Sequence, residues 1–434
     1  METGIQLMNE KPPEISSVVE HLFRHEAGKM VATLTGIFGI EHLTLAEDVV
    51  QEALTRALQT WPFYGVPKNP AAWIMRASRN LAVDVVRRQK IFRDKEAEII
   101  RLMDREGAAP DAAIFTEQEI TDDTLRMMFV CCHPSITTEA QAALALKTLC
   151  GFSVPEIARA FLTTEAAIAK RLTRAKQKIR EAGIPFEIPA GEALGQRLDG
   201  VLPSLYLLFN EGYKASSGDR LVREDICQEA IRLTELLVQH PAGNRPKTHA
   251  LLALMLLDTA RLQARVDREG NLLLLEDQNR SRWNQPMIAR GMFHLAQSAA
   301  GGEISVYHLQ AGIAACHCTA QDYASTDWRQ ILSLYDRLVE LDGSPVVALN
   351  RAVVIANLHG PGAGLDAVAA IRDLEVLNTY YLLHAILGEF ESRLNHAQAA
   401  AGHFRRSLQL AGIKSEQAFL AKRLRACEGK MFRA

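Results

Sequence analysis

The chain has 434 residues and a formal net charge of −2, with 48% hydrophobic and 23% charged residues. This length favours two to four globular domains over a single core. No apolar run approaches the roughly 20 residues that a membrane span needs. The N-terminus lacks the apolar core of a signal peptide, so we expect a cytoplasmic protein.

Seven cysteines, an odd number without a repeated spacing, argue against a disulfide framework. Cys131-Cys132-His133 and Cys316-His317-Cys318 contain residues that bind metals, but neither has a second ligand pair at zinc-finger spacing. We therefore expect buried thiols, no metal and no cofactor.

Two helices are predicted near the N-terminus. Apolar spacing indicates the first from Ser17 to about Phe38, with Gly28 weakening its middle. The second is predicted to start at the capping box Thr44-Leu45-Ala46-Glu47 and to end near Leu58. Its apolar side is Val50, Leu54, Ala57 and Leu58, and its outward side carries an acidic, amide-bearing strip of Asp48, Gln51, Glu52 and Thr55.

Three prolines and a glycine predict a non-helical loop from Trp61 to Pro70, which also carries Trp61, Phe63 and Tyr64. The helix that follows, Ala71 to about Gln89, is expected to bury Ile74, Ala77, Leu81 and Val85. Aromatic rings beside an Arg-bearing helix can stack unpaired bases and hold phosphates, although such rings can also simply anchor a loop. The outward residues of this helix are Arg76, Arg79, Asn80, Arg87 and Arg88.

A helix-turn-helix is predicted between Ser153 and about Arg180. Helices at Asp122 to Cys132 and Glu139 to Leu149 precede it, and residues 89 to 121 have the alternating charges of a linker. Ser153-Val154-Pro155-Glu156 is a capping box, and the hydroxyl of Thr164 can cap the second helix. That second helix has an inward face of Ile168, Leu172, Ala175 and Ile179.

Positive charge is concentrated in this motif. Residues 136 to 182 hold eight Lys or Arg and four Glu, whereas the remainder of the chain is acidic. Such a patch supplies the electrostatic part of DNA affinity, and the second helix has the form of one that enters a major groove. The alternative is a solvated helix in an ordinary bundle.

The order and spacing of several motifs resemble regions 2 and 4 of extracytoplasmic-function RNA polymerase sigma factors. The motifs are Leu45 to Glu52, Ala72-Trp73, Arg79 to Asp84, Arg87-Arg88 and the helix-turn-helix, and the resemblance covers about Ser17 to Ile188. It implies that Asp48, Gln51 and Glu52 bind the polymerase core, with the beta-prime and beta subunits as the partners. It also implies a −10 surface of Trp61, Phe63, Tyr64, Arg76, Arg79, Asn80, Arg87 and Arg88.

The same resemblance assigns the second helix of the motif to the −35 element. Many members begin this helix with Gly-Thr-Val-Lys-Ser-Arg, whereas this chain has Ala166-Ala167-Ile168-Ala169-Lys170-Arg171, so promoter sequence is not transferable. The implied −35 residues are Thr164, Glu165, Ala166, Ala169, Lys170, Arg171, Thr173, Arg174 and Lys178.

Beyond Pro189 the chain adds about 240 residues with helical patterns. Ala348 to Val353 and Leu382 to Leu387 stand 34 residues apart, which is the tetratricopeptide period. This part resembles the C-terminal extension of one sigma-factor subgroup, a resemblance that implies control by the extension in place of a separate anti-sigma protein. The motifs are Tyr206 to Tyr213, Leu275 to Trp283 and Ser344 to Ala352.

The extension lacks a nucleophile elbow, a phosphate loop and metal-ligand spacing, so we do not expect an enzyme. Its charged loop is interpreted as a salt-bridged segment pinned by Trp283, with a ligand or interdomain site as the alternative. The loop residues are Glu276, Asp277, Arg280, Arg282 and Trp283.

The sequence therefore predicts an all-helical sigma factor with four parts. They are region 2 (1 to 92), a linker (93 to 121), region 4 (122 to 188) and a tetratricopeptide-like regulatory extension (189 to 434). Its expected partners are the polymerase core and promoter DNA, without a membrane. The alternative is a stand-alone helix-turn-helix regulator whose repeat domain senses a ligand.

Overall fold

The computed structural model describes residues 15–89, 117–161, 163–189, 192–213, 224–265, 267 and 272–431. These residues form an all-helical structure, which confirms the predicted fold class. The chain divides into two compact units: Met1–Ala158 with Thr164–Ser204, and Arg159–Thr163 with Leu205–Ala434. Among the described helices, none is both long and apolar enough to cross a membrane.

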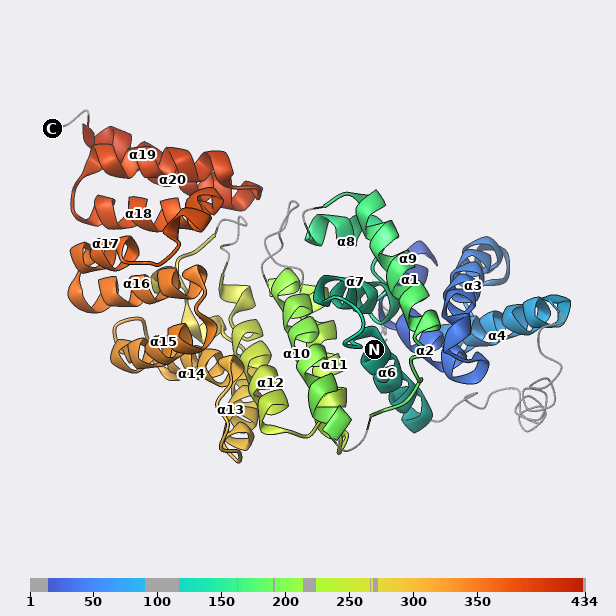
Figure 1. Ribbon diagram of the computed structural model, residues 1–434. Coiled ribbons are helices and arrows are strands. Elements are labelled where there is room, and N and C mark those ends of the chain that lie inside the picture. The colour runs from blue at the N-terminus through green and yellow to red at the C-terminus, as the bar shows by residue number, and fades with distance from the viewer. Residues whose placement is uncertain are drawn as a thin grey trace, which may run out of the picture. The chain divides into compact units, whose positions relative to one another are not determined.

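The first unit contains both predicted modules apart from Arg159–Thr163, and α2 packs directly against α6 (Figure 1). The N-terminal helices are α1 (Ile15–His25), α2 (Ala27–Phe38), the 3₁₀ turn η1 (Ile40–His42), α3 (Leu43–Tyr64) and α4 (Pro70–Gln89). They are followed by α6 (Glu117–Cys131), α7 (Thr138–Thr148), α8 (Val154–Ala160), α9 (Glu165–Glu181) and α10 (Glu192–Tyr213).

The first predicted helix is in fact two, because the chain breaks at Glu26 between α1 and α2. Gly28 has a different role from the predicted weakening of a single helix. A Cβ atom on Gly28 would lie 2.1 Å from the carbonyl oxygen of Leu149, at the end of α7. Glycine at this position therefore allows the backbones of the two modules to approach closely.

The capping box predicted at Thr44 is wrong. Helix α3 begins at Leu43, and its N-cap residue, His42, makes no side-chain cap hydrogen bond. The Glu47 carboxylate instead accepts a hydrogen bond from Thr148 Oγ1 at 3.1 Å and pairs with the Lys176 ammonium. The Glu47 carboxylate, which the capping box would have used, therefore binds residues that are distant in the sequence.

Helix α3 also extends further than predicted, since it passes through Pro62 and ends at Tyr64. The Trp61 side chain anchors this last turn: it is 2% exposed and packs edge-on against Trp73, with ring centroids 5.5 Å apart. Gly65, with φ of +80°, then terminates the helix and donates its N–H to the Trp61 carbonyl. Only residues 65–69 of the predicted loop are non-helical, because α4 begins at Pro70.

The buried face of α4 differs from the predicted one. Ile74 is buried as expected, but Ala77, Leu81 and Val85 are only partly buried. The hydroxyl of Ser78 is tolerated inside because it donates to the Ile74 carbonyl at 2.9 Å. Packing of α3 on α4 selects this face, which consists of Ile74, Met75, Ser78, Ala82 and Val83.

Both helix starts of the predicted helix-turn-helix are confirmed. The Glu156 carboxylate accepts from the Ser153 N–H at 2.8 Å, and the Glu156 N–H lies 3.4 Å from Ser153 Oγ, completing the box. Thr164 Oγ1 accepts from the Ala167 N–H at 3.2 Å. Local capping hydrogen bonds therefore mark the starts of α8 and α9 as predicted.

The N-terminal half of α10 belongs to the first unit, although the sequence assigns everything after residue 188 to the extension. Arg197 donates to the Phe129 carbonyl of α6 at 2.6 Å. A Cβ atom on Gly200 would lie 2.8 Å from the Cys132 carbonyl oxygen. Arg197 and Gly200 of α10 thus contact the C-terminal end of α6 and the residue that follows it.

The second unit is a stack of helices in which successive members pack on one another (Figure 1, yellow to red). The predicted 34-residue repeat places its two copies in α16 and α18, each of which packs with the helix that follows it. The helices are α11 (Glu224–Gln239), α12 (Pro246–Thr259), α13 (Gln285–Ser298), α14 (Val306–Thr319), α15 (Trp328–Asp342), α16 (Pro345–His359), α17 (Pro361–Ala369), α18 (Tyr381–Arg393), α19 (Ala397–Leu410) and α20 (Lys414–Met431).

The charged loop between α12 and α13 is pinned as predicted, but not by salt bridges. Trp283 is 3% exposed, and the Arg280 guanidinium lies 4.8 Å from its ring centroid. Arg280 donates to the carbonyls of His317 and Ala320 at 2.6 and 2.9 Å. In the described ranges, neither Arg280 nor Arg282 forms an ion pair with Glu276 or Asp277.

All seven cysteines are free thiols, and five of them are buried. Burial raises the pKa of the Cys132 thiol to about 11 and that of Cys227 to about 12. Within the described ranges, no three His, Cys, Asp or Glu side chains are grouped so as to hold a metal ion.

A stacked histidine pair joins α12 and α13. His249 Nδ1 and His294 Nδ1 are 2.9 Å apart, and His249 Nε2 lies 3.1 Å from Asn244 Oδ1. Since that amide oxygen accepts, His249 Nε2 carries a hydrogen and His249 Nδ1 accepts from His294. Burial, the neighbouring His249 and Arg290 together lower the pKa of His294 from 6.5 to about 4.

We expect the free energy of unfolding to decrease as pH falls from 6.5 toward 4. In this window the unfolded chain binds more protons than the folded chain, because folding holds histidines such as His294 and His317 neutral. Thermal melts between pH 7.5 and 4.5 measure the slope. His294→Gln should reduce the slope, whereas His359→Gln, at an exposed position, should leave it unchanged. Equal slopes in all three proteins would contradict this assignment.

Candidate nucleic-acid interface

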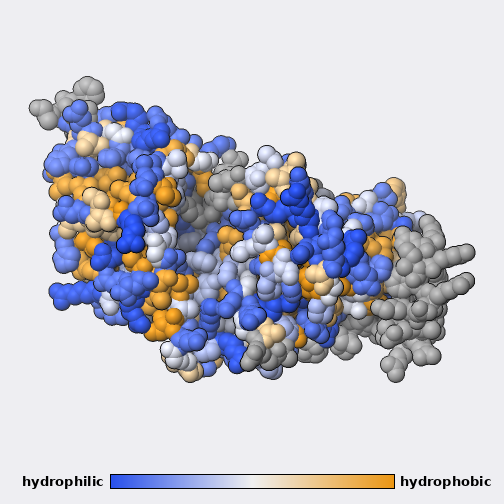
Figure 2. All heavy atoms as spheres, viewed as in Figure 1, coloured by the Kyte–Doolittle hydropathy of each residue, from blue (hydrophilic) through white to orange (hydrophobic). Residues whose placement is uncertain are grey.

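The outer face of α9 is polar, basic and open to solvent. Ile168, Leu172, Ala175 and Ile179 are buried as predicted, which leaves the opposite face exposed. Hydrophilic atoms dominate the surface where α9 appears in Figure 2. The exposed residues are Thr164, Glu165, Ala166, Ala169, Lys170, Thr173, Arg174, Gln177, Lys178, Arg180 and Glu181, with Arg171 half-buried beside them.

The acidic strip on α3 is also exposed. Asp48, Gln51, Glu52 and Thr55 all face solvent, and Arg56 is paired with Glu52 at 3.1 Å. Partial burial of the Asp48 carboxyl, then the neighbouring Glu47, raises its pKa above the ordinary value. Leu58 was expected to be buried but is 45% exposed, so the solvent face of α3 continues with an apolar residue.

The end of α3 presents two aromatic rings to solvent. Phe63 is 83% exposed and Tyr64 is 87% exposed, whereas Trp61 is buried. We therefore retain Phe63 and Tyr64, and not Trp61, as candidates to stack unpaired bases. On α4, Arg76 and Asn80 are exposed and Arg79 is partly buried, while the side chains of Arg87 and Arg88 lie outside the described residues.

The two modules meet through contacts that the sequence analysis missed. Besides the approach at Gly28, the Glu47 carboxylate of α3 joins Thr148 of α7 and Lys176 of α9. The side chains of Lys176 and Glu47 are 19% and 16% exposed. The sequence did contain one indication of this contact: Lys176 lies next to the buried stripe of α9, so it could be expected to be partly buried.

Comparison with known proteins finds a matching family for part of each module. The family model for sigma-70 region 2 matches residues 22–91, and the model for sigma-70 region 4 matches residues 126–179. A family of unknown function, DUF6596, matches residues 197–299. An uncharacterized protein of Rhizobium meliloti (strain 1021) is 41% identical over 386 residues, covering 88% of this chain and 90% of that protein.

The chain belongs to the sigma-70 family, as a sigma factor of the extracytoplasmic-function type with a C-terminal extension. Its regions 2 and 4 are those of a factor for transcription initiation, which binds the polymerase core and promoter DNA. The DUF6596 match begins at residue 197, inside the part of α10 that packs on region 4. No solved structure matches the chain.

Two substitutions on α9 of this sigma factor should have different effects on promoter binding. We expect Arg171→Ala to weaken binding to all promoters alike and to lower the salt slope by about one, as the loss of a phosphate contact does. Lys170→Ala should instead change the preference between promoters. Holoenzyme binding to a promoter panel measures both, with Lys422→Ala on α20 as the charge-matched control. If both variants changed the affinity for every promoter by the same factor, the assignment of Lys170 to the base-reading face would be refuted.

Proposed function

We propose that this sigma factor engages the −10 and −35 elements through separate surfaces of the first unit and is controlled by its own C-terminal helical stack. The observation that carries the proposal is the exposure of two different DNA-competent surfaces on two modules. One is the basic outer face of α9. The other consists of the Phe63 and Tyr64 rings and the polar side of α4.

The −35 proposal rests on the chemistry of α9. Lys170, Arg174 and Lys178 recur every four residues along one exposed side, so they can follow the groove and its phosphates. Thr164 and Glu165 lie at the N-terminus of the helix, where backbone N–H groups face outward.

The −10 proposal rests on exposed rings held by a rigid anchor. Trp61 fixes the last turn of α3 in the core, so Phe63 and Tyr64 are presented without a long flexible loop. Stacking of one unpaired base on an aromatic ring contributes about 1–3 kcal/mol, which offsets the stacking lost when the duplex opens.

Core binding is proposed for the acidic strip of α3. Asp48, Gln51 and Glu52 are exposed, while the adjacent Glu47 is occupied between the modules. The strip therefore remains available while the two modules are in contact, a state that we call the closed first unit.

The closed first unit is too small to bind both elements at once. Elements centred near −10 and −35 lie about 25 base pairs, or roughly 85 Å, apart on straight B-DNA. A compact unit of this size has a radius of gyration of about 16 Å. The contacts at Gly28 and Glu47 must therefore break before both elements are held, and this separation offers a step at which the extension can act.

Transcription with the polymerase core tests the proposal. The full chain should stimulate transcripts from some members of a genomic promoter pool, and replacing Asp48, Gln51 and Glu52 together by Ala should reduce this stimulation at least tenfold. Gln59→Ala, elsewhere on the exposed face of α3, is the matched control. Tight duplex binding by the chain alone, without any stimulation of the core, would favour the stand-alone regulator.

A further inference from the structure

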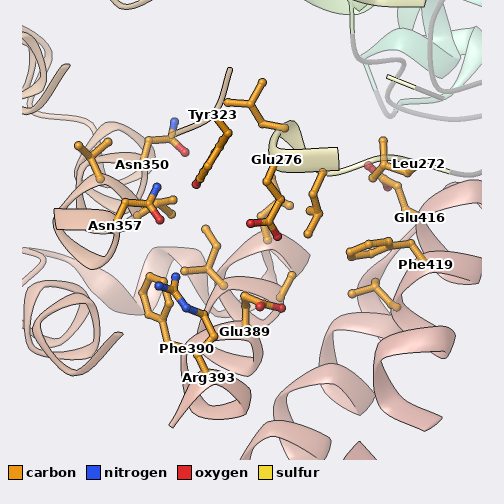
Figure 3. A pocket seen from close by; sticks show the side chains of 18 of the residues that line it. Leu272, Glu276, Tyr323, Asn350, Asn357, Glu389, Phe390, Arg393, Glu416 and Phe419 are labelled. Carbon is orange, nitrogen blue, oxygen red and sulfur yellow. The ribbon is translucent and has the colours of Figure 1, made fainter. Parts of the chain in front are cut away.

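The helical stack of the second unit contains a cavity of about 870 Å³, which lies in the size range of small-molecule sites. Side chains from α14, α15, α16, α18, α19 and α20 line it, together with the segment from Leu272 to Glu276. Figure 3 shows the Glu276 side chain reaching into the space opposite Glu389 and Arg393.

Aromatic and aliphatic side chains form most of the wall. Rings can bury the apolar body of a ligand, and their faces also attract a positive charge. Seven residues of the lining have rings suited to this: Tyr323, Trp328, Tyr335, Tyr381, Phe390, Phe404 and Phe419.

The charges of the wall are predominantly negative. Glu276, Glu389 and Glu416 line the cavity, and Arg393 is the one guanidinium among the described lining residues. His317 adds no charge near neutral pH, because burial, then Arg261 and Arg280, lowers its pKa to about 3.

The three carboxylates differ in their partners. Glu389 pairs with Arg423, and Glu416, which is 4% exposed, accepts a hydrogen bond from the Tyr381 hydroxyl. Glu276 is exposed and makes no ion pair with any other described residue. It is therefore the carboxylate that is free to bind a charged ligand.

We propose that this cavity is a binding site for a small organic cation: an amine with an apolar body, whose ammonium group pairs with Glu276. The rings hold the apolar body and face the charge. Asn350 and Asn357, two turns apart on α16, add amide groups on the same side of the cavity as Tyr323 (Figure 3). The excess of carboxylates over guanidinium disfavours an anion of the same shape.

This site does not depend on the proposed control of transcription. If the extension acts as proposed above, the cation is its effector. Binding and transcription are separate measurements, so a failure of one is distinguishable from a failure of the other.

Three dansyl probes with one scaffold test the site on the full chain: dansylcadaverine (cation), N-pentyl dansylamide (neutral) and dansyl-6-aminohexanoate (anion). Fluorescence titration up to 1 mM should show that the cation binds at least tenfold more tightly than the neutral probe, with the anion weakest. Equal affinities, or absence of binding by the cation, would overturn the proposal.

Variants locate the binding. Glu276→Gln should weaken cation binding about tenfold and leave the neutral probe unchanged, whereas Glu303→Gln, at an exposed position outside the lining, should alter neither. Phe419→Ala should weaken all three probes. Circular dichroism checks that each variant is folded. An unchanged preference for the cation in Glu276→Gln would reject the assigned ion pair, and unchanged binding in Phe419→Ala would reject the cavity.

Discussion

Charge reversal at Glu47 should separate the two sigma modules. Glu47→Lys places an ammonium group against Lys176 and leaves Thr148 without its carboxylate partner. Breaking a buried pair costs about 3–5 kcal/mol, and the partial exposure of this one lowers the expected value to roughly 2–4 kcal/mol. Hydrogen exchange should increase where the modules meet, in α2, in the end of α7 and in α9.

A double variant in which the two charges are swapped provides the decisive control. The double variant Glu47→Lys with Lys176→Glu should restore much of the lost protection, because it rebuilds the pair with opposite polarity. Glu181→Lys, at an exposed position on α9, changes charge without touching the junction and should leave exchange unaltered. Failure of the double variant to recover protection would show that the pair does not hold the modules together.

Opening should also affect function. If the modules must separate to bind promoter DNA, a weaker junction lowers the free energy of that step. Glu47→Lys should then need less protein for half-maximal stimulation of the core. An increase in exchange without any change in stimulation would mean that opening does not limit holoenzyme assembly.

A chain that ends after Pro189 should be less stable than one that ends after Ser204. The shorter chain loses the bond from Arg197 to the Phe129 carbonyl and the burial of Leu194 and Leu198 in the first half of α10. Together these losses amount to several kcal/mol, and each kcal/mol shifts the melting temperature of a unit this size by about 2–4 °C. Melting curves should differ by at least 5 °C.

Two glycines of α10 provide a matched pair in the full chain. Gly200→Ala drives a Cβ atom to 2.8 Å from the Cys132 carbonyl oxygen and should destabilise the first unit by about 1–3 kcal/mol. Gly195→Ala meets nothing within 4 Å and should be neutral or slightly stabilising, because alanine favours a helix. Equal effects would refute the packing of α10 on α6.

The truncation also tests control by the extension. A comparison of the chain ending after Ser204 with the full chain, at equal core concentration, separates the loss of control from the loss of folding that a cut at Pro189 introduces. Equal stimulation by both proteins would contradict control by the extension.

Features specified by residues three or four apart were predictable. The Ser153 and Thr164 caps and the inward stripe of α9 depend on local hydrogen bonds and helical spacing, and the structure has them as predicted. The exposed strip of α3 follows from the same spacing. The all-helical class and the sigma-factor family were therefore available from the sequence by itself.

Features that depend on distant partners were decided only by the tertiary structure. Glu47 has the spacing of a capping residue, but Thr148 and Lys176 lie beside it in space. Pro62 predicts a helix end, yet burial of Trp61 against Trp73 holds the turn. Likewise, α10 divides between units, and Glu276 reaches the same cavity as Glu389, because packing brings together segments far apart in the chain.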